Sequence, residues 1–160
     1  MVVLFFTATL LAQSLMGGSL PIDGISCDRQ EGALLHIHTH VELFDKGRAV
    51  GIPADIGFSE AGQCLYWIHT HTPDGYVHIE APVKRTFTLG QFFDIWDQSF
   101  SWTTAGSMVA PHGKRLSIWV NGKPWHGSDP RDIPLADRET IVIQNGPPFA
   151  RPTPSDWSKL

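Results

Sequence analysis

Six of the eight histidines recur at every other position on three short stretches of the chain. They are His36, His38, His40, His69, His71 and His78. Successive side chains of a β-strand point to opposite faces of a sheet, so histidines two positions apart share one face. Imidazole is the commonest protein ligand for metal ions, and it titrates near neutral pH. The pattern therefore indicates a metal site, a proton-handling surface or a buried polar network.

The metal interpretation requires imidazoles from adjacent strands to converge on one face. Three or four such groups make a site that suits zinc or copper. The predicted ligands are His38, His40, His69, His71 and His78, with His36 and Glu80 as secondary candidates. Glu42 and Glu80 share the phase of the histidines and could instead orient a ligand imidazole. The alternative is that the histidines are solvated or held in a hydrogen-bond network, and the sequence leaves both open.

Other functional motifs fit the chain poorly. Cys64, His69 and His71 are followed by no Met until Met108, a spacing that does not suit a blue-copper site. Glu80 lies too far beyond His71 for a cupin pattern, and neither His-Glu-x-x-His nor Gly-x-Ser-x-Gly occurs. A net charge of −4 without a basic stripe argues against nucleic acid as a partner.

Two of the histidine-bearing stretches, 64–71 and 76–81, are predicted to form a hairpin around a Pro-Asp-Gly turn. This turn places His69 opposite His78. Directly opposed residues have Cβ atoms about 5 Å apart, so the register would bring imidazoles of two strands together. A slip of one residue would move His78 to the other face.

The remaining elements predict a mostly antiparallel sheet with one helix. Further strands are expected at 34–45, 49–52, 115–120, 123–125 and 139–144. Thr88 and Gln91 match a capping box, and apolar residues then follow one face of a helix over 89–97. That helix should pack on the apolar face of the sheet, opposite the histidines. The predicted fold class is α+β with an N-terminal transmembrane or tether segment, and a β-sandwich is the second choice.

The N-terminus is apolar and uncharged. Counted through Leu20, the stretch reaches about the length that crosses a bilayer as a helix. A cleavable signal peptide would need a basic start and a small-x-small cleavage site, and neither is visible. We predict a transmembrane anchor or uncleaved signal at 1–20, a tether at 21–33, a His-rich β-domain at 34–146 and an extended Pro-rich tail at 147–160. The domain would then lie on the extracytoplasmic side of the membrane.

The two cysteines, Cys27 and Cys64, agree with that location. A pair of cysteines in an exported domain is more often a disulfide than a reactive pair. We therefore expect a disulfide between them. Two free thiols, or one thiolate recruited to a metal, are the alternatives.

Several blocks of the chain resemble a group of bacterial membrane-anchored proteins with no established activity. The blocks are HIHTH, CLYWIHTHTPDGYVHIEAP, RTFTLGQFFDIW and LSIWVNGKPW. The resemblance extends over about residues 22–146. It implies an N-terminal membrane segment followed by one small extracytoplasmic domain, with the histidines inside the defining motifs. It implies no ligand and no activity.

Three functions follow from these observations, in order of preference. The first is a membrane-anchored, extracytoplasmic, non-catalytic domain that binds copper or zinc through its His-lined face. The second is a structural accessory subunit of a larger electron-transfer or energy-converting membrane complex, in which the histidines form hydrogen bonds and hold no metal. The third is a metal-dependent hydrolase or lyase.

Overall fold

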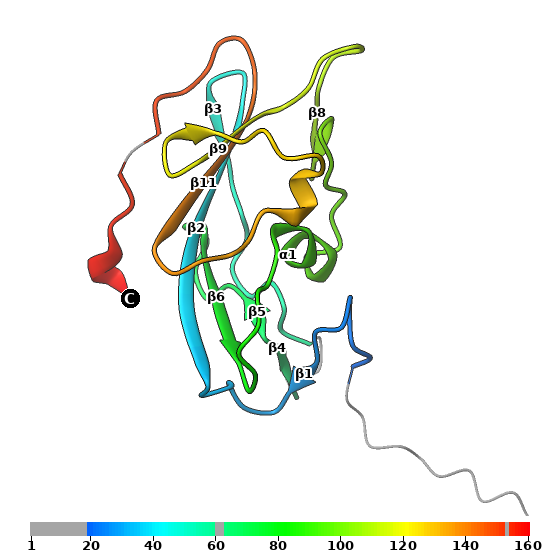
Figure 1. Ribbon diagram of the computed structural model, residues 1–160, viewed down its shortest axis with the longest axis vertical. Helices are drawn as coiled ribbons and strands as arrows, with labels where there is room; N and C mark the ends of the chain where they lie inside the picture. Colours follow the sequence, from blue (N-terminus) through cyan, green and yellow to red (C-terminus); the bar gives the residue numbers. More distant parts are fainter. Residues whose placement is uncertain (1–18, 60–62, 153) are drawn as a thin grey trace, which may run out of the picture.

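A single large sheet organises the molecule. The computed structural model describes residues 19–59, 63–152 and 154–160 (Figure 1). The sheet has seven strands in the order β10-β9-β11-β2-β6-β5, with β3 also paired to β2. The helix α1 lies on one side of this sheet, and the C-terminal segment lies on the other. The described residues thus confirm an α+β fold with a mostly antiparallel sheet and one α-helix.

Most elements are short. The strands are β1 (Cys27–Asp28), β2 (Leu35–Asp45), β3 (Arg48–Val50), β4 (Leu65–Tyr66), β5 (Ile68–His69), β6 (Tyr76–Ala81), β7 (Thr104–Ala105), β8 (Met108–Val109), β9 (Ser117–Val120), β10 (Lys123–Pro124) and β11 (Glu139–Asn145). The helices are α1 (Leu89–Ile95) and the two 3₁₀ turns η1 (Pro130–Asp132) and η2 (Trp157–Lys159).

The long strand β2 is the centre of the sheet. Its first part pairs antiparallel with β6, its last part pairs with β3, and its other edge pairs parallel with β11. Alternation along β2 buries Val41 and Leu43, which are 1% and 2% exposed, in the core. The same alternation turns the histidines of β2 away from the core, as predicted for residues 34–45.

The predicted hairpin register is confirmed, although the predicted strand over 64–71 is interrupted. β5 pairs with β6 so that His69 lies opposite His78. The interruption falls at Trp67, because the preceding residues form β4 and pair with β1 instead of β6. The main chain of Trp67 still accepts a hydrogen bond of 2.8 Å from the Glu80 amide.

The turn before β6 requires glycine at position 75. Gly75 has a φ of +83°, which favours a residue without a side chain. A Cβ at this position would also lie 2.3 Å from the Val41 carbonyl oxygen. The Gly75 carbonyl accepts a hydrogen bond of 2.9 Å from the Val41 amide. This close approach fixes where β6 begins against β2, and therefore which residues of the two strands face each other.

The helix α1 starts as its capping box predicts. The Thr88 hydroxyl accepts a hydrogen bond from the Gln91 amide, and the Gln91 side chain accepts one from the Thr88 amide. Phe92 and Phe93 are fully buried. The helix ends at Ile95, earlier than the expected residue 97. Its aromatic residues join the core on the side of the sheet that carries no histidine cluster.

The segment predicted as a tether at 21–33 is joined to the domain. Ile25 is fully buried, and Cys27 forms a disulfide with Cys64, as expected. The part of the chain that the structure describes contains no helix of the length and apolarity that a membrane crossing needs. Most of the predicted anchor at 1–20 falls on residues 1–18, which lie outside the described residues.

The Pro-rich segment at 147–160 was predicted to be an extended tail. It runs back across the face of the sheet opposite α1 (Figure 1). The Ala150 amide donates a hydrogen bond of 2.8 Å to the Gln144 side chain on β11. Further along, the Ser155 hydroxyl lies 2.7 Å from that of Thr140. The segment ends in η2, beside the histidine-bearing end of β2.

We predict that removal of the disulfide destabilises the domain. Cys27 and Cys64 are 37 residues apart, and a covalent loop of that size stabilises a fold by about 3–4 kcal/mol in the chain-entropy estimate. The double variant Cys27→Ser/Cys64→Ser should therefore lose most of that free energy of unfolding in urea titrations. Reductant should lower the stability of the wild type but leave that of the variant unchanged. A loss below about 1 kcal/mol would contradict the prediction.

Candidate metal centre

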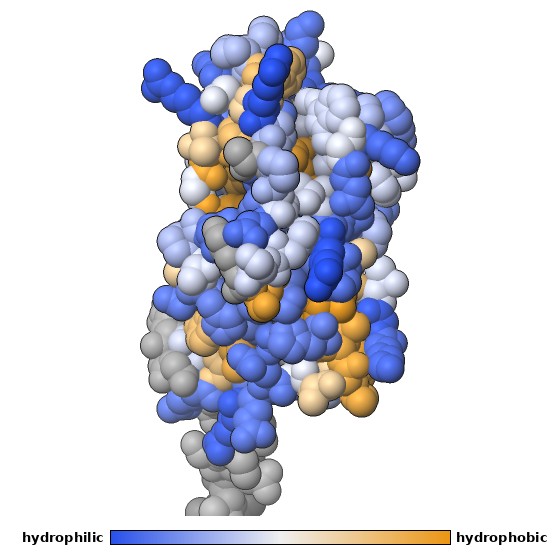
Figure 2. Space-filling view, turned by 90° about the vertical axis from the view of Figure 1, so that its left-hand side faces the viewer, coloured by the Kyte–Doolittle hydropathy of each residue, from blue (hydrophilic) through white to orange (hydrophobic). Residues whose placement is uncertain are grey.

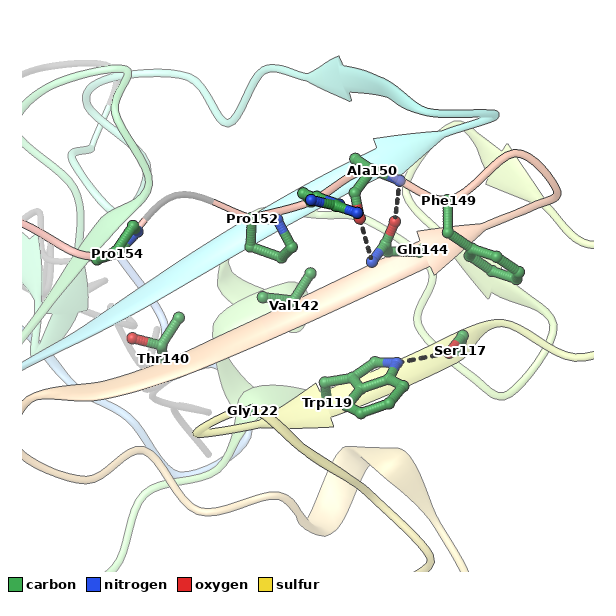
Figure 3. Close-up of a pocket in the computed structure, with 11 residues that line it drawn as sticks. Ser117, Trp119, Gly122, Thr140, Val142, Gln144, Phe149, Ala150, Pro152 and Pro154 are labelled. Carbon is green, nitrogen blue, oxygen red and sulfur yellow. Dashed lines mark hydrogen bonds between the residues drawn. The ribbon is translucent and has the colours of Figure 1, made fainter.

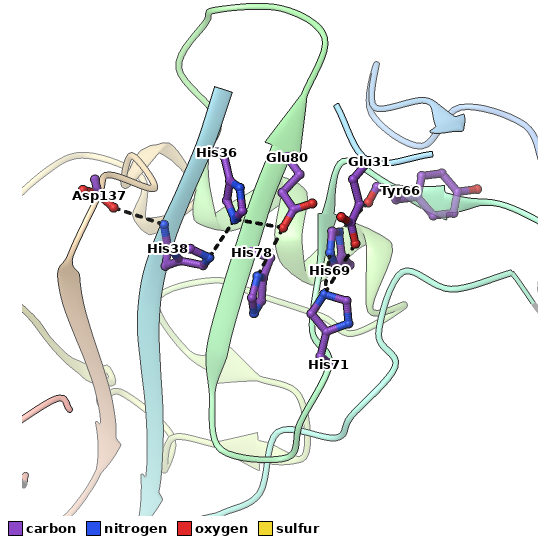
Figure 4. Close-up of polar contacts among 9 residues, drawn as sticks. All are labelled: Glu31, His36, His38, Tyr66, His69, His71, His78, Glu80 and Asp137. Atoms are coloured by element: carbon purple, nitrogen blue, oxygen red, sulfur yellow. Dashed lines mark hydrogen bonds and ion pairs between the residues drawn. The ribbon is translucent and has the colours of Figure 1, made fainter. Parts of the chain in front are cut away.

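Three adjacent strands place their histidines in one row. His38 on β2 lies opposite His78 on β6, which in turn lies opposite His69 on β5. A second row pairs His36 with Glu80. The middle strand β6 thus contributes one imidazole and one carboxylate, with a His-x-His pair on each side (Figure 4).

The first group of ligand atoms comprises His36, His38, His78 and Glu80, all within 4.8 Å of one another. The Nε2 atom of His36 lies 3.1 Å from His38 Nε2 and 3.1 Å from Glu80 Oε1. His78 Nδ1 lies 3.4 Å from the same carboxylate oxygen. Ligand atoms around a tetrahedral zinc ion are about 3.3–3.4 Å apart for bonds of about 2.0–2.1 Å. The spacing therefore suits a bound ion of this size.

The second group comprises His69, His71, His78 and Glu80 and meets the same limit of 4.8 Å. His69 Nδ1 lies 2.9 Å from the Tyr66 carbonyl oxygen. Since a carbonyl only accepts, Nδ1 carries the proton and Nε2 presents its lone pair. That Nε2 lies 3.3 Å from His71 Nε2. The Tyr66 carbonyl thus fixes the orientation of the His69 ring. Metal-binding histidines are commonly oriented by a hydrogen bond of this kind.

The Nδ1 atom of His78 is buried and makes no hydrogen bond with the described residues. A buried polar atom left in this state costs about 1–3 kcal/mol. The ring is surrounded by other imidazoles, with centroids 4.5 Å away for both His38 and His71. A cation that accepts the Nδ1 lone pair would remove this cost.

Burial keeps the central imidazoles neutral. Desolvation, aided by the neighbouring His38 and His71, lowers the pKa of His78 to about 3. Desolvation also lowers the pKa of His69 to about 4, against the opposing effect of the Tyr66 carbonyl. The pKa of His38 is lowered by burial and by His36. Neutral imidazole is the form that binds metal ions, so at neutral pH these rings are ready to act as ligands.

The pKa of the Glu80 carboxyl group is raised, whereas those of the imidazoles are lowered. Burial, together with a hydrogen bond and charge repulsion from Glu31, raises its pKa to about 7. A carboxylate that is costly to ionise gains most from a cation placed beside it. Glu80, a secondary candidate in the sequence, thus lies at the middle of both ligand groups.

Glu31 is a site residue that the sequence did not reveal. It lies in the segment expected to be a tether, yet its Oε1 is 3.8 Å from His71 Nε2. Gly32 makes this possible, because a Cβ there would lie 2.2 Å from the Ala81 carbonyl carbon. The Gly32 amide also donates a 3.3 Å hydrogen bond to the Glu80 carbonyl. In the sequence, the one indication of this role is that Glu31 precedes a glycine and lies near the predicted disulfide.

His40, a predicted ligand, is not brought into either group. Its Nε2 lies 3.0 Å from the Asp74 carbonyl, and its Nδ1 lies 2.8 Å from the Ser155 hydroxyl. Its ring stacks on Tyr76, whose hydroxyl donates a hydrogen bond to the Asp156 carbonyl. Both ring nitrogens are thus engaged, and the contacts of His40 fasten the C-terminal segment to the sheet.

Glu42 also lies outside both groups. It follows His40 on β2 and lines a smaller pocket at the turn before β6. One of its carboxylate oxygens is buried without a hydrogen bond, and burial raises the pKa of the group. The predicted role of Glu42 in orienting a metal-bound imidazole has no counterpart in these contacts.

A cavity of about 580 Å³ opens directly onto the cluster. His36, His38, His71, His78, Glu31 and Glu80 line it. Leu160 of the C-terminal segment lies at its border. Figure 2 faces the side over which this segment runs, and hydrophilic side chains cover most of that side. The first ligand group, and His71 of the second, are therefore accessible to ions from solution, whereas His69 is fully buried.

A second cavity of about 580 Å³ lies between β11, β9 and the Pro-rich segment (Figure 3). Trp119 and Val142 form its floor, and Phe149 and Pro152 belong to the segment opposite. Arg151 is the one charged residue among the described residues that line it. This groove offers apolar contact but no cluster of ligand atoms.

Comparison of the chain with known protein families, with curated proteins and with solved structures finds no match.

We predict that acid destabilises the metal-free protein through His69 and His78. The folded-state pKa values of about 4 and about 3 lie below the ordinary 6.5, so the unfolded chain binds more protons and stability falls as the pH falls through this range. Glu80, with its pKa raised to about 7, has the opposite effect between pH 4.5 and 7. The net loss should therefore be steepest between about pH 5 and 4.

Urea titrations across this pH range, in the presence of chelator, provide the measurement. His78→Asn should show a shallower pH dependence than the wild type, because asparagine takes up no proton. His112→Asn, at an exposed position outside the cluster, serves as the matched control and should follow the wild type. If the free energy of unfolding depended on pH equally in His78→Asn and in the wild type, the assigned role of His78 would be contradicted.

Proposed function

We propose that this chain is a membrane-anchored, extracytoplasmic protein that binds a transition metal ion, copper or zinc, through the histidines on β2, β5 and β6 and His71 just beyond β5. Its role is metal binding without catalysis. The observation that carries the proposal is the buried Nδ1 of His78, which makes no hydrogen bond and lies among converging imidazole and carboxylate groups.

The donor set supports this choice of metals. Imidazole nitrogens suit zinc and copper, whereas magnesium and calcium prefer sites made of oxygen. Each group contains three imidazoles and one carboxylate. The only cysteines are joined in the disulfide and supply no thiolate.

The disulfide also supports the proposed location. Disulfides persist in oxidising compartments and are rare in the cytosol. The first eighteen residues, which lie outside the described residues, carry no charged side chain. Together these features favour a domain held at the outer surface of a membrane.

We predict that two substitutions, one in each ligand group, abolish tight metal binding. The full-length chain, purified without a polyhistidine tag and stripped with chelator, would be titrated with Zn²⁺ and with Cu²⁺ by calorimetry. The variant His38→Ala/His71→Ala should bind either ion at least about 10–100-fold more weakly, since loss of even an indirect metal contact has an effect of that size.

The matched control is His40→Ala/His112→Ala, which also removes two imidazoles, one of them on the same face of β2. It should bind metal as the wild type does, and circular dichroism would verify that both variants fold. A wild type that binds neither ion would overturn the proposal and leave the histidines as a hydrogen-bond network. Equal weakening in both double variants would overturn it as well.

A further inference from the structure

We infer that the cluster holds two metal ions, with the carboxylate of Glu80 between them. This inference rests on the proposed function and specifies it further. The first ion would be bound by His36, His38, His78 and one oxygen of Glu80. The second would be bound by His69, His71 and the other oxygen of Glu80, with Glu31 in the place of His78, which is assigned to the first ion.

No ligand group contains both His-x-His pairs. One pair lies on β2, and the other begins with His69 on β5 and ends with His71 just beyond it. The strands β2 and β5 flank β6 on opposite sides. The ligand atoms form two groups of four, which share His78 and Glu80 and contain one His-x-His pair each. Two ions, one beside each pair, would therefore use both groups.

The first ion has a complete ligand set without rearrangement of the chain. Contacts of 3.1 Å join His36 Nε2 to His38 Nε2 and to Glu80 Oε1. His78 Nδ1 lies 3.4 Å from the same oxygen. The His78 Nδ1, which makes no hydrogen bond, is therefore assigned to this ion, which lies on the β2 side of β6.

The second ion obtains its carboxylate from the N-terminal segment. His69 Nε2 and His71 Nε2 lie 3.3 Å apart, and Glu31 Oε1 lies 3.8 Å from His71 Nε2. Glu31 and Glu80 also lie within hydrogen-bonding distance of each other. Two carboxylates this close repel one another unless a proton or a cation lies between them, and a metal ion on the β5 side of β6 would take the place of the proton.

Glu80 is suited to join the two ions. A carboxylate has two oxygens, each able to bind a cation, and paired metal ions in proteins are about 3.5–4 Å apart. The Glu80 side chain is only 4% exposed, and it belongs to both ligand groups.

The test is the number of zinc ions per chain. The full-length, untagged protein would be loaded with Zn²⁺, dialysed and measured by elemental analysis. We expect two ions in the wild type, one in His36→Ala and one in His71→Ala. These two histidines are chosen because their side chains are 57% and 40% exposed, so the substitutions leave the core intact. Glu31→Gln should also retain one ion, and His112→Ala should retain two.

The outcomes separate this inference from the proposed function. One zinc ion in the wild type would overturn the two-ion inference and leave a single metal site. No zinc in the wild type would overturn both. Complete loss of zinc in both His36→Ala and His71→Ala would show that the residues form one site, which also contradicts the inference. As a second readout, two Cu²⁺ ions joined by Glu80 should couple magnetically and weaken the paramagnetic resonance signal per copper.

Discussion

The pairing of β2, β6 and β5 in one register is the constraint on which the site depends. Because side chains alternate along each strand, a shift of one residue in β6 would move His78 and Glu80 into the core. The turn at Gly75 prevents that shift, since its backbone packs against the Val41 carbonyl where a side chain would not fit. The apolar residues of the same strands oppose it too, because Val77 and Ile79 are fully buried on the other face.

Two segments from the ends of the described chain complete the surroundings of this sheet face. The N-terminal segment is fastened by the disulfide and by the β1–β4 pair, and it brings Glu31 to the β5 side of the cluster. The C-terminal segment is fastened by His40 and Tyr76, and it borders the cavity above the cluster. The histidine-bearing face of the sheet is therefore bordered by one of these segments on each side.

Much of this arrangement could be predicted from local sequence. Alternation predicted that the histidines of β2 share a face, the Pro-Asp-Gly turn predicted the opposition of His69 and His78, and the capping box predicted the start of α1. Each of these depends on residues close together in the chain. Turn chemistry and side-chain periodicity are local properties, so a single sequence contains them.

Other features depended on contacts between distant segments and were not predictable. Glu31 reaches the cluster only because β1 pairs with β4 and Gly32 passes close to the end of β6. His40 has the same spacing as His38, but Ser155 and Asp74 engage its ring nitrogens. The parallel pairing of β11 with β2 likewise joins strands that no local pattern relates.

The central claim is that imidazole nitrogens from separate strands converge on a cation. X-ray absorption spectroscopy at the zinc edge, recorded on the zinc-loaded full-length chain, tests it most directly. The account predicts nitrogen and oxygen ligands at about 2.0–2.1 Å, with the outer-shell scattering of several imidazole rings. A spectrum with only water-like oxygen ligands and no imidazole scattering would contradict it.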